Sequence, residues 1–209
     1  MRLNIGIVDY GLGNVRSVQN ALERLDCRVF LSRNEETLAK ADALILPGVG
    51  AFHAAMHEIT TTGLDAILRR LAIDQRKPLL GICLGMQVLA EWGEEHGRLR
   101  GLGFIPGEVK ALVPGAGRKI PHVGWSGVAL RAAGKNLFSR KAEDDSYYFD
   151  HSYVFDAPEK YRAATVAWDD ELVVAVAKEN VMGVQFHPEK SQNAGLRILK
   201  AFTQFTKTC

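Results

Sequence analysis

The stretch that decides the fold is Leu79–Gln87, which reads LLGICLGMQ. Apolar residues up to Ile82 are typical of a buried strand, and the residues after Cys83 begin a helix. Gly81 and Gly85 leave room for a sharp turn between the two elements, because a Cβ at either position would collide with the backbone. The G-x-C-x-G frame therefore predicts a nucleophile elbow in which sulfur replaces oxygen.

This turn predicts a reactive cysteine. At a helix N-terminus the amide dipoles favour the thiolate of Cys83 over the thiol, and we expect the side chain to be pushed out of the fold. The same geometry aims the backbone N–H of Leu84 at the space in front of the sulfur, where a carbonyl oxygen becomes negative during attack. The pattern favours acyl-transfer chemistry.

A proton carrier for this thiolate lies downstream in Met182–Lys190, which reads MGVQFHPEK. His187 follows an apolar strand and enters a loop. Pro188 fixes φ, so we expect it to hold His187 and Glu189 in a rigid extended step. Glu189 can then orient the imidazole and stabilise its cation, which gives a nucleophile, a base and an orienting acid in chain order.

A third special turn lies in Leu44–Phe52, which reads LILPGVGAF. A buried strand runs there into a glycine-flanked turn that could offer the Val49 N–H as a second oxyanion donor. The alternative is an ordinary strand-to-helix turn. An isolated cysteine and histidine are more often a buried apolar thiol and an unrelated surface imidazole. Here, however, turns with unusual backbone geometry are predicted at the cysteine, at the histidine and at Val49.

These three blocks resemble the signature blocks of the class I, triad-type glutamine amidotransferases. Further segments are similar to the glutaminase subunits of imidazole glycerol phosphate synthase, and the similarity covers essentially the whole chain: Asp9–Asn14 followed by Ser17, Gly101–Gly107, Pro121–Trp125 and His151–Tyr153. Ser126 stands where that family usually has asparagine, and Asp150 where it usually has a small apolar residue. Both positions belong to the expected substrate rim and partner face.

The resemblance implies that the chain hydrolyses L-glutamine to glutamate and ammonia through a cysteine thioester. It implies the catalytic residues Cys83, His187 and Glu189, the oxyanion donors Val49 and Leu84, and the substrate-binding residues Gly48, Gly50, Gln87, His151, Ser152 and Tyr153. Taken alone, Gln87 could equally be a helix-surface amide and Tyr153 a core aromatic.

The sequence has no second set of catalytic residues, no phosphate-binding loop and no cofactor motif. We therefore expect no cofactor, and we expect that another protein uses the ammonia. The resemblance implies a (β/α)8 cyclase subunit, in a heterodimer that serves histidine biosynthesis. Two other functions stay open: the glutaminase subunit of another synthase, and a non-enzymatic cysteine redox sensor on the same scaffold.

Composition agrees with a single α/β domain over residues 1–209, since 47% hydrophobic content supplies a sizeable core. The net charge is +2 and no basic run is interleaved with aromatics, so nucleic acid is not an expected partner. Three cysteines form no disulfide framework, which favours a reducing cytoplasm. The longest apolar runs are too short to cross a membrane, and no export signal is evident.

Apolar periodicity predicts strands at 3–8, 28–31, 43–46 and 78–82, with a helix marked by Leu64, Ile67, Leu68 and Leu71 before the last of them. Between 108 and 187 closely spaced strands, such as 147–155 and 172–177, suggest antiparallel additions. The expected fold is α/β and flavodoxin-like, with a mostly parallel sheet flanked by helices. Sites in such a sheet form beyond the carboxyl ends of the strands.

Three other motifs are incomplete. The glycines at 11 and 13 suggest a dinucleotide fingerprint, but Arg16 occupies the third glycine position. His53 and His57 have metal-ligand spacing without a third ligand, and the adjacent acids Asp144 and Asp145 point in different directions. We therefore predict no metal site.

Overall fold

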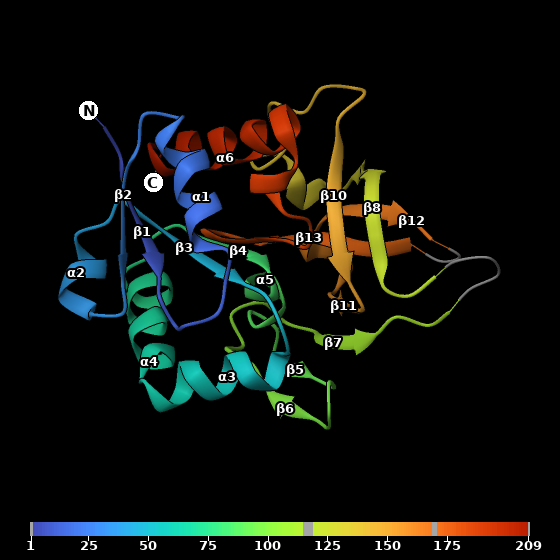
Figure 1. Ribbon diagram of the computed structural model, residues 1–209, viewed down its shortest axis with the longest axis horizontal. Helices are drawn as coiled ribbons and strands as arrows, with labels where there is room; N and C mark the ends of the chain where they lie inside the picture. Colours follow the sequence, from blue (N-terminus) through green and yellow to red (C-terminus); the bar gives the residue numbers. More distant parts are fainter. Residues whose placement is uncertain (1, 115–118, 169–170, 209) are drawn as a thin grey trace.

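The computed structural model describes residues 2–114, 119–168 and 171–208 (Figure 1). Within them the main sheet has eight strands in the order β2-β1-β3-β4-β14-β13-β12-β9. The strands are β1 Asn4–Val8, β2 Arg28–Ser32, β3 Ala43–Gly48, β4 Leu79–Cys83, β9 Ala129–Leu130, β12 Arg162–Ala167, β13 Glu171–Lys178 and β14 Val181–Val184. The first five in spatial order pair in parallel, and the other three are joined by antiparallel pairing.

In the parallel part the chain order of the strands is 2-1-3-4-5, which is the flavodoxin-like arrangement. The prediction of a mostly parallel sheet with antiparallel additions is confirmed. Strands β3, β4 and β14 in the middle of the sheet are completely buried because helices cover both faces, whereas the edge strand β2 is partly exposed.

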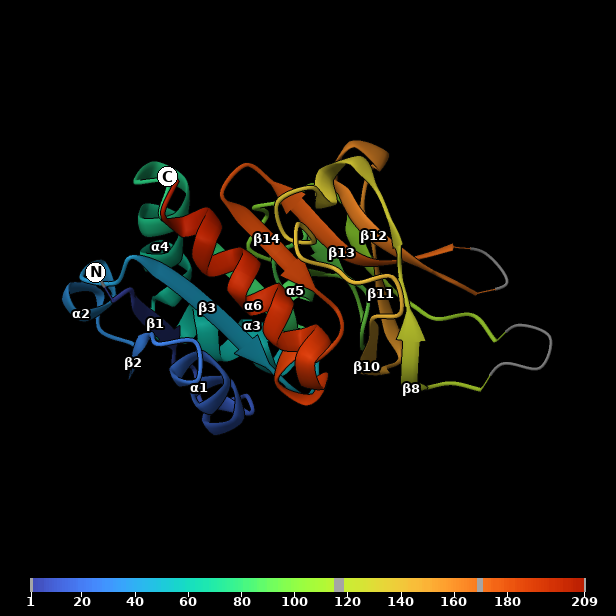
Figure 2. The ribbon, with the colours of Figure 1, turned by 90° about the horizontal axis from the view of Figure 1, so that it is seen from above.

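Helices α1 Val15–Glu23 and α6 Gln192–Thr206 lie on one face of the sheet (Figures 1 and 2). The other face carries α2 Glu35–Ala39, α3 Phe52–Thr61, α4 Leu64–Leu68 and α5 Leu84–Gln87. The helix predicted around Leu64 ends as an α-helix at Leu68 and continues as a π-helix, Arg69–Asp74.

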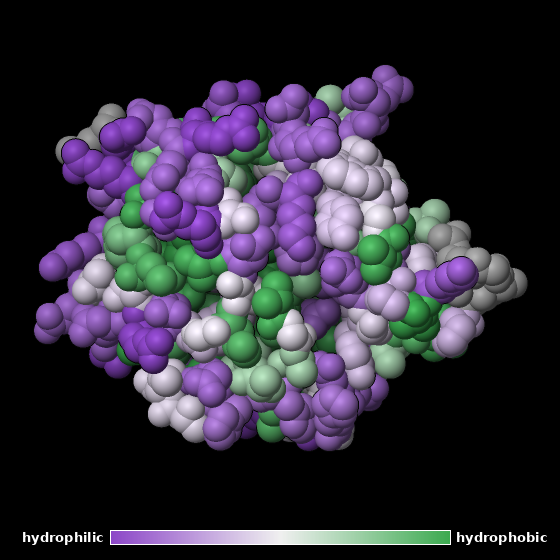
Figure 3. Space-filling view, in the orientation of Figure 1, coloured by the Kyte–Doolittle hydropathy of each residue, from purple (hydrophilic) through white to green (hydrophobic). Residues whose placement is uncertain are grey.

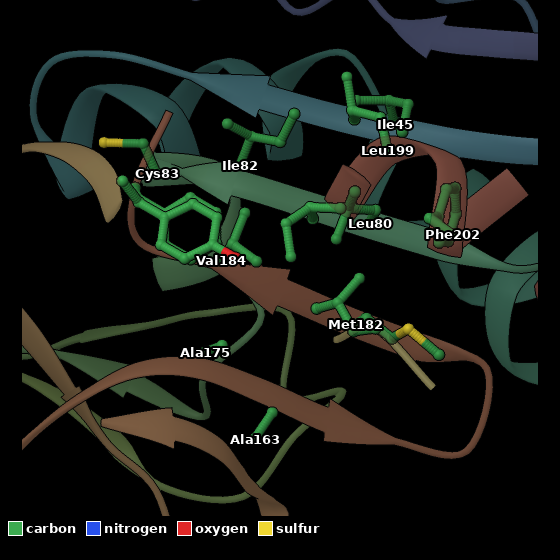
Figure 4. Close-up of a cluster of buried hydrophobic side chains, with 14 of the residues drawn as sticks. Ile45, Leu80, Ile82, Cys83, Ala163, Ala175, Met182, Val184, Leu199 and Phe202 are labelled. Carbon is green, nitrogen blue, oxygen red and sulfur yellow. The ribbon is translucent and has the colours of Figure 1, made fainter. Parts of the chain in front are cut away.

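Two hydrophobic clusters fill the spaces between sheet and helices. Strand alternation divides β3 between them: Ile45 joins the cluster under α1 and α6, whereas Leu44 and Leu46 join the cluster under α3 and α4. Figure 4 shows the first cluster, with Leu80 of β4 between the sheet and Phe202 of α6.

Two smaller sheets extend the C-terminal half. One pairs β8 His122–Gly127 with β10 Ser146–His151, and the other has the order β11-β7-β5-β6, with β5 Trp92–Gly93, β6 Leu99–Arg100, β7 Glu108–Ala111 and β11 Tyr153–Asp156. The predicted strand 147–155 is therefore two strands that join different sheets, divided at Ser152. Short 3-10 helices occur at Ala132–Gly134, Glu159–Tyr161 and Pro188–Lys190.

The surface in the orientation of Figure 1 has hydrophilic side chains over α6 and apolar ones in the middle of the face (Figure 3). No helix among the described residues combines the length and apolarity needed to cross a bilayer.

Candidate active site

Cys83 lies in the turn between β4 and α5, with its backbone in the left-handed region at φ 54°. Such a conformation is strained for a residue with a Cβ, and it persists only where the surroundings enforce it. The flanking glycines allow the close approach that enforces it: a Cβ on Gly85 would overlap the carbonyl oxygen of Leu46, and one on Gly81 would lie 2.5 Å from the carbonyl oxygen of Gly85. The predicted elbow is present.

The thiol lies at the base of a cavity and not on the outside of the fold, as Cys83 is only 7% exposed. The expectation that it would be pushed out of the fold is wrong in this respect, because the loops that follow β14 and β10 cover the turn. Figure 4 shows the sulfur at the end of β4, beyond Ile82.

Three neighbouring parallel strands bring the predicted turns together. Gly48 at the end of β3 pairs with Cys83 at the end of β4, and Val184 at the end of β14 pairs with Ile82. Their carboxyl ends therefore meet at one edge of the sheet, where the chain leaves β14 toward His187.

His187 and Glu189 form a buried pair behind the thiol. Nδ1 of His187 lies 2.9 Å from Oε1 of Glu189, and both side chains are almost fully buried. Burial alone would lower the pKa of the His187 imidazole, but hydrogen bonds with Cys83 and Glu189 and their negative charges raise it to about 9. The pair therefore favours an imidazolium next to the sulfur.

The backbone around Glu189 differs from the prediction of an extended step. His187 itself is extended, but Pro188–Lys190 is a turn of 3-10 helix. Proline suits the first position of a helix, and the amide of Lys190 donates to the carbonyl of His187 at 3.1 Å. This turn folds the Glu189 carboxylate back onto the imidazole.

Two buried amides, those of Gln185 and Gln87, also belong to the site. Nε2 of Gln185 lies 3.6 Å from Sγ of Cys83, and Oε1 of Gln185 accepts from Nε2 of Gln87 at 3.1 Å. Gln87 also donates to the carbonyl of Tyr153 at 3.2 Å. Sequence reasoning did not single out the Gln185 side chain, although a polar residue at the end of an apolar strand was a visible signal.

A pair of buried histidines supports the same carbonyl. Nδ1 of His151 lies 2.8 Å from the carbonyl oxygen of Tyr153, and Nε2 of His151 lies 2.9 Å from Nδ1 of His122. A carbonyl only accepts, so Nδ1 of His151 carries the proton and its Nε2 accepts from His122. Burial, together with the charges of His122 and His187, lowers the pKa of His151 to about 4 in spite of the Tyr153 carbonyl.

Ser126 closes this chain, with its hydroxyl oxygen 3.1 Å from Nε2 of His122. In the tautomers fixed above, that nitrogen accepts, so the hydroxyl donates. The serine at this departure from the family pattern therefore satisfies a buried imidazole.

The cavity in front of Cys83 has a volume of about 350 Å³. Nine predicted site residues line it: Val49, Gly50, Cys83, Leu84, Gln87, His151, Ser152, Tyr153 and His187. Gly48 lies behind the wall, where a Cβ would overlap the Tyr10 hydroxyl, and Glu189 lies behind His187. The wall also contains Glu95, which sequence reasoning missed, and Pro121, Asp150 and Lys190, which were not among the predicted site residues although Asp150 was expected at the substrate rim.

Glu95 comes from the loop between β5 and β6, far from the predicted blocks. Its Oε2 accepts from the backbone N–H of Phe52 at 2.6 Å, so it caps the start of α3. A carboxylate held at the rim of the cavity can also meet a cationic group of a substrate.

The other candidate motifs have structural explanations. Nε2 of His53 lies 3.2 Å from the carbonyl oxygen of Gly97, and Asp145 binds Arg197 of α6, with Nε 3.0 Å from Oδ2. No group of metal-binding side chains occurs among the described residues.

Residues 6–204 match the family Glutamine amidotransferase class-I. The chain is 43% identical to imidazole glycerol phosphate synthase subunit HisH 2 of Vibrio vulnificus, over 98% of this chain and 96% of the relative. It is 44% identical to subunit HisH of Bacillus licheniformis, over 97% of each.

Among solved structures, a glutamine amidotransferase superposes with a TM-score of 0.75 at 21% identity, covering 97% of this chain and 98% of that one. PurLQS from Thermotoga maritima superposes with a TM-score of 0.72 at 18% identity, covering 98% of this chain and 99% of that one. At these identities the likeness concerns the fold alone. The family model and the HisH relatives confirm the resemblance seen in the sequence. The chain belongs to the class-I glutamine amidotransferase family, among the relatives of the HisH subunit of imidazole glycerol phosphate synthase.

Proposed function

We propose that this chain is the glutaminase subunit of an imidazole glycerol phosphate synthase. It hydrolyses L-glutamine to glutamate and ammonia and passes the ammonia to a cyclase subunit in histidine biosynthesis. The observation that carries the proposal is the strained Cys83 turn next to the His187–Glu189 pair, with Cys83 and His187 lining one cavity. The names of relatives at 43% and 44% identity support the same activity.

In the first half-reaction the Cys83 thiolate attacks the carboxamide carbon of glutamine and forms a carbon–sulfur bond. The carbonyl electrons move to oxygen, where the N–H groups of Leu84 and Val49 stabilise the negative charge. When that charge returns, the carbon–nitrogen bond breaks and the His187 imidazolium gives its proton to the departing nitrogen, which leaves as ammonia. A pKa of about 9 keeps this proton available near neutral pH.

In the second half-reaction His187, now neutral, takes a proton from water as the oxygen attacks the γ-glutamyl thioester. The carbon–sulfur bond then breaks, glutamate leaves, and the thiolate–imidazolium pair is restored. Glu189 holds the imidazole orientation throughout.

The cavity wall supplies the groups that the α-substituents of glutamine require. Both amide hydrogens of Gln87 are used within the protein, so its Oε1 is the atom that can accept from the α-ammonium group. Glu95 and Asp150 add negative charge to the same cavity. Gly48 and Gly50 shape the turn after β3, and His151–Tyr153 line the same cavity as Gly50.

The proposed partner is a (β/α)8 cyclase subunit in a heterodimer, in the cytoplasm and without nucleic acid. Ammonia released into water is protonated near neutral pH and is no longer a nucleophile, so direct transfer to a bound partner preserves its reactivity. Two apolar side chains of β8 are exposed beside the cavity, Val123 at 54% and Trp125 at 48%. Pro121, just before this strand, lines the cavity itself, so a partner covering β8 would also meet the cavity rim.

The two other functions are less well supported. A glutaminase subunit of another synthase would share the triad, but the relatives above carry the imidazole glycerol phosphate synthase name. A redox sensor would need the thiolate but not the buried Glu189 or a cavity lined by Gln87 and Glu95.

The test compares ammonium salt with glutamine as the source of ammonia for the synthesis of imidazole glycerol phosphate. With a cyclase partner and its ribonucleotide substrate, excess ammonium salt should give imidazole glycerol phosphate without this chain, whereas glutamine should require it. Cys83→Ala should abolish only the glutamine-dependent reaction. Glutamate release unchanged by the cyclase, with no complex detected, would leave a free-standing glutaminase or a component of another synthase.

A further inference from the structure

A buried polar chain that does not include His187 also reaches the nucleophile. Its last link is the amide of Gln185, which is fully buried and has its Nε2 3.6 Å from Sγ of Cys83. An amide can present either its N–H or its oxygen to a neighbour, and these have opposite effects on a charged sulfur. The orientation of the Gln185 amide therefore decides what it does to the nucleophile.

The backbone carbonyl of Tyr153 fixes that orientation. A carbonyl can only accept, so the nitrogen of Gln87, 3.2 Å away, must face it. The second hydrogen of the same nitrogen points to Oε1 of Gln185 at 3.1 Å. With its oxygen engaged in this way, Gln185 has only its N–H to present to Cys83.

The same carbonyl also accepts from Nδ1 of His151 at 2.8 Å. Since His151 in turn accepts from His122, the carbonyl is held between two donors that cannot reverse their roles. The polarity of the chain is thus set by backbone and imidazole groups away from the sulfur.

We propose that Gln185 is a positioning residue for the nucleophile: its amide N–H, oriented by Gln87 and the Tyr153 carbonyl, stabilises negative charge on the sulfur of Cys83. An N–H donor favours the ionised form of an acceptor over the neutral form. The sulfur thus lies between two donors, the imidazolium of His187 and the amide of Gln185. This inference rests on the proposed function only in so far as Cys83 is the nucleophile.

The test is the pH profile of Cys83 alkylation by iodoacetamide in the full chain, followed by peptide mapping. Among the described residues, His187 and Tyr10 are ionisable groups that interact with the sulfur, and the pKa of the Tyr10 phenol is raised by burial and by the Cys83 charge. Both stay unchanged in the variants. Gln185→Met removes the donor with little change in side-chain length, and we expect the midpoint to move up by about one pH unit, with about tenfold slower alkylation below it.

Asn180 gives a matched control, because it is a buried amide next to the other end of the same strand. It donates to the carbonyls of Ala72 and Lys77, far along β14 from Cys83. Asn180→Leu should lower the melting temperature as Gln185→Met does, yet leave the alkylation profile where it is in the wild type. An equal shift in both variants would mean a general effect of instability and would overturn the proposal.

Gln87→Met provides a second route, since it keeps Gln185 but releases its orientation. We expect a smaller shift in the same direction. A folded Gln185→Met protein with the wild-type profile overturns the proposal, and if that variant does not fold, a wild-type profile in Gln87→Met does so. Absence of glutamate release by the wild type would instead refute the glutaminase proposal, while the alkylation comparison would still report on the amide and the sulfur.

Discussion

The backbone N–H of His187 donates to the carbonyl oxygen of Tyr148 at 2.9 Å, which ties the loop after β14 to strand β10. The hydroxyl of Ser191 completes the clamp: it accepts from the N–H of Tyr148 at 2.9 Å and donates to the carbonyl of His187 at 2.6 Å. The proposed base is therefore held by the strand that also carries His151 into the cavity. The ring of Tyr148 lies near Trp125 of β8 and under the ammonium group of Lys190.

Ser191→Ala should loosen this clamp. The serine is fully buried, so its removal leaves the N–H of Tyr148 without its acceptor and should cost about 1–3 kcal/mol of unfolding free energy. We also expect about a tenfold loss of kcat for glutamine hydrolysis, because the base is less well placed. Denaturant unfolding and steady-state kinetics measure the two effects.

Thr203→Ala is the control for Ser191→Ala, because Thr203 is a buried residue whose hydroxyl donates within α6, to the carbonyl of Lys200. It should change kcat very little. An unaltered kcat in a folded Ser191→Ala protein would argue against the clamp.

The elbow should not tolerate a side chain at Gly85. Gly85→Ala places the Cβ of a residue in α5 onto the carbonyl oxygen of Leu46, which is fixed in the buried strand β3, and should cost about 4 kcal/mol or more. Gly63→Ala meets open space and suffers only from its left-handed φ of 71°, so about 1 kcal/mol is expected. Similar melting temperatures for the two variants would contradict this explanation of the G-x-C-x-G frame.

His187 should make stability fall at alkaline pH. Burial lowers its pKa, but hydrogen bonds with Cys83 and Glu189 raise it to about 9, above the value near 6.5 of the unfolded chain. The native state therefore binds the proton more tightly, and this stabilisation is complete below about pH 6.5 and is lost as the pH rises through about 9. A plot of the free energy of unfolding against pH across this interval should be flatter for His187→Gln than for the wild type.

His151 should have the opposite effect at acid pH. Burial, the leading cause, holds its pKa near 4, so the unfolded state takes up the proton first as the pH falls below about 6.5. Stability contributed by the neutral imidazole is then lost, by up to about 3 kcal/mol once the pH is below about 4. His151→Gln keeps an acceptor for His122 and should lose less stability over this range. Parallel acid curves for the two proteins would show that another group is responsible.

We propose that residues 1–209 form a single folding unit, because the two hydrophobic clusters share the strands of one sheet. Fluorescence and far-ultraviolet circular dichroism should then follow one cooperative transition in denaturant. Two separated transitions would contradict a single domain.

The parts of the site that could be read from the sequence are those set by local backbone chemistry. Gly81 and Gly85 flank the turn that places Cys83 in the left-handed region, as the G-x-C-x-G frame predicts. The pairing of His187 with Glu189 was also predicted, although Pro188 begins a 3-10 turn there and not the extended step expected from the sequence. The parallel sheet was predicted from alternating apolar strands and helices, and the observed strand order brings the ends of β3, β4 and β14 together.

The parts that could not be read depend on contacts between distant segments. Gln185 contacts Cys83, which is 102 positions away in the sequence, and Gln87, which is 98 positions away. A local sequence pattern cannot predict such contacts. Glu95 enters the cavity from the loop after β5. That strand has two residues, which are too few to show the alternation of apolar and polar residues that predicts a strand. The division at Ser152 was missed because both strands are rich in aromatic residues, which suit a continuous strand equally well.

The most direct measurement is to trap the intermediate on the nucleophile. The protein is mixed with isotopically labelled L-glutamine and quenched in acid, and its peptides are mapped by mass spectrometry for a γ-glutamyl thioester, while glutamate release is followed in parallel. We expect a thioester on the peptide that contains Cys83. The adduct and glutamate release should both be lost in Cys83→Ala and both be retained in Cys27→Ala. Glutamate release by a folded Cys83→Ala protein within tenfold of the wild-type rate would contradict the assignment of Cys83 as the nucleophile.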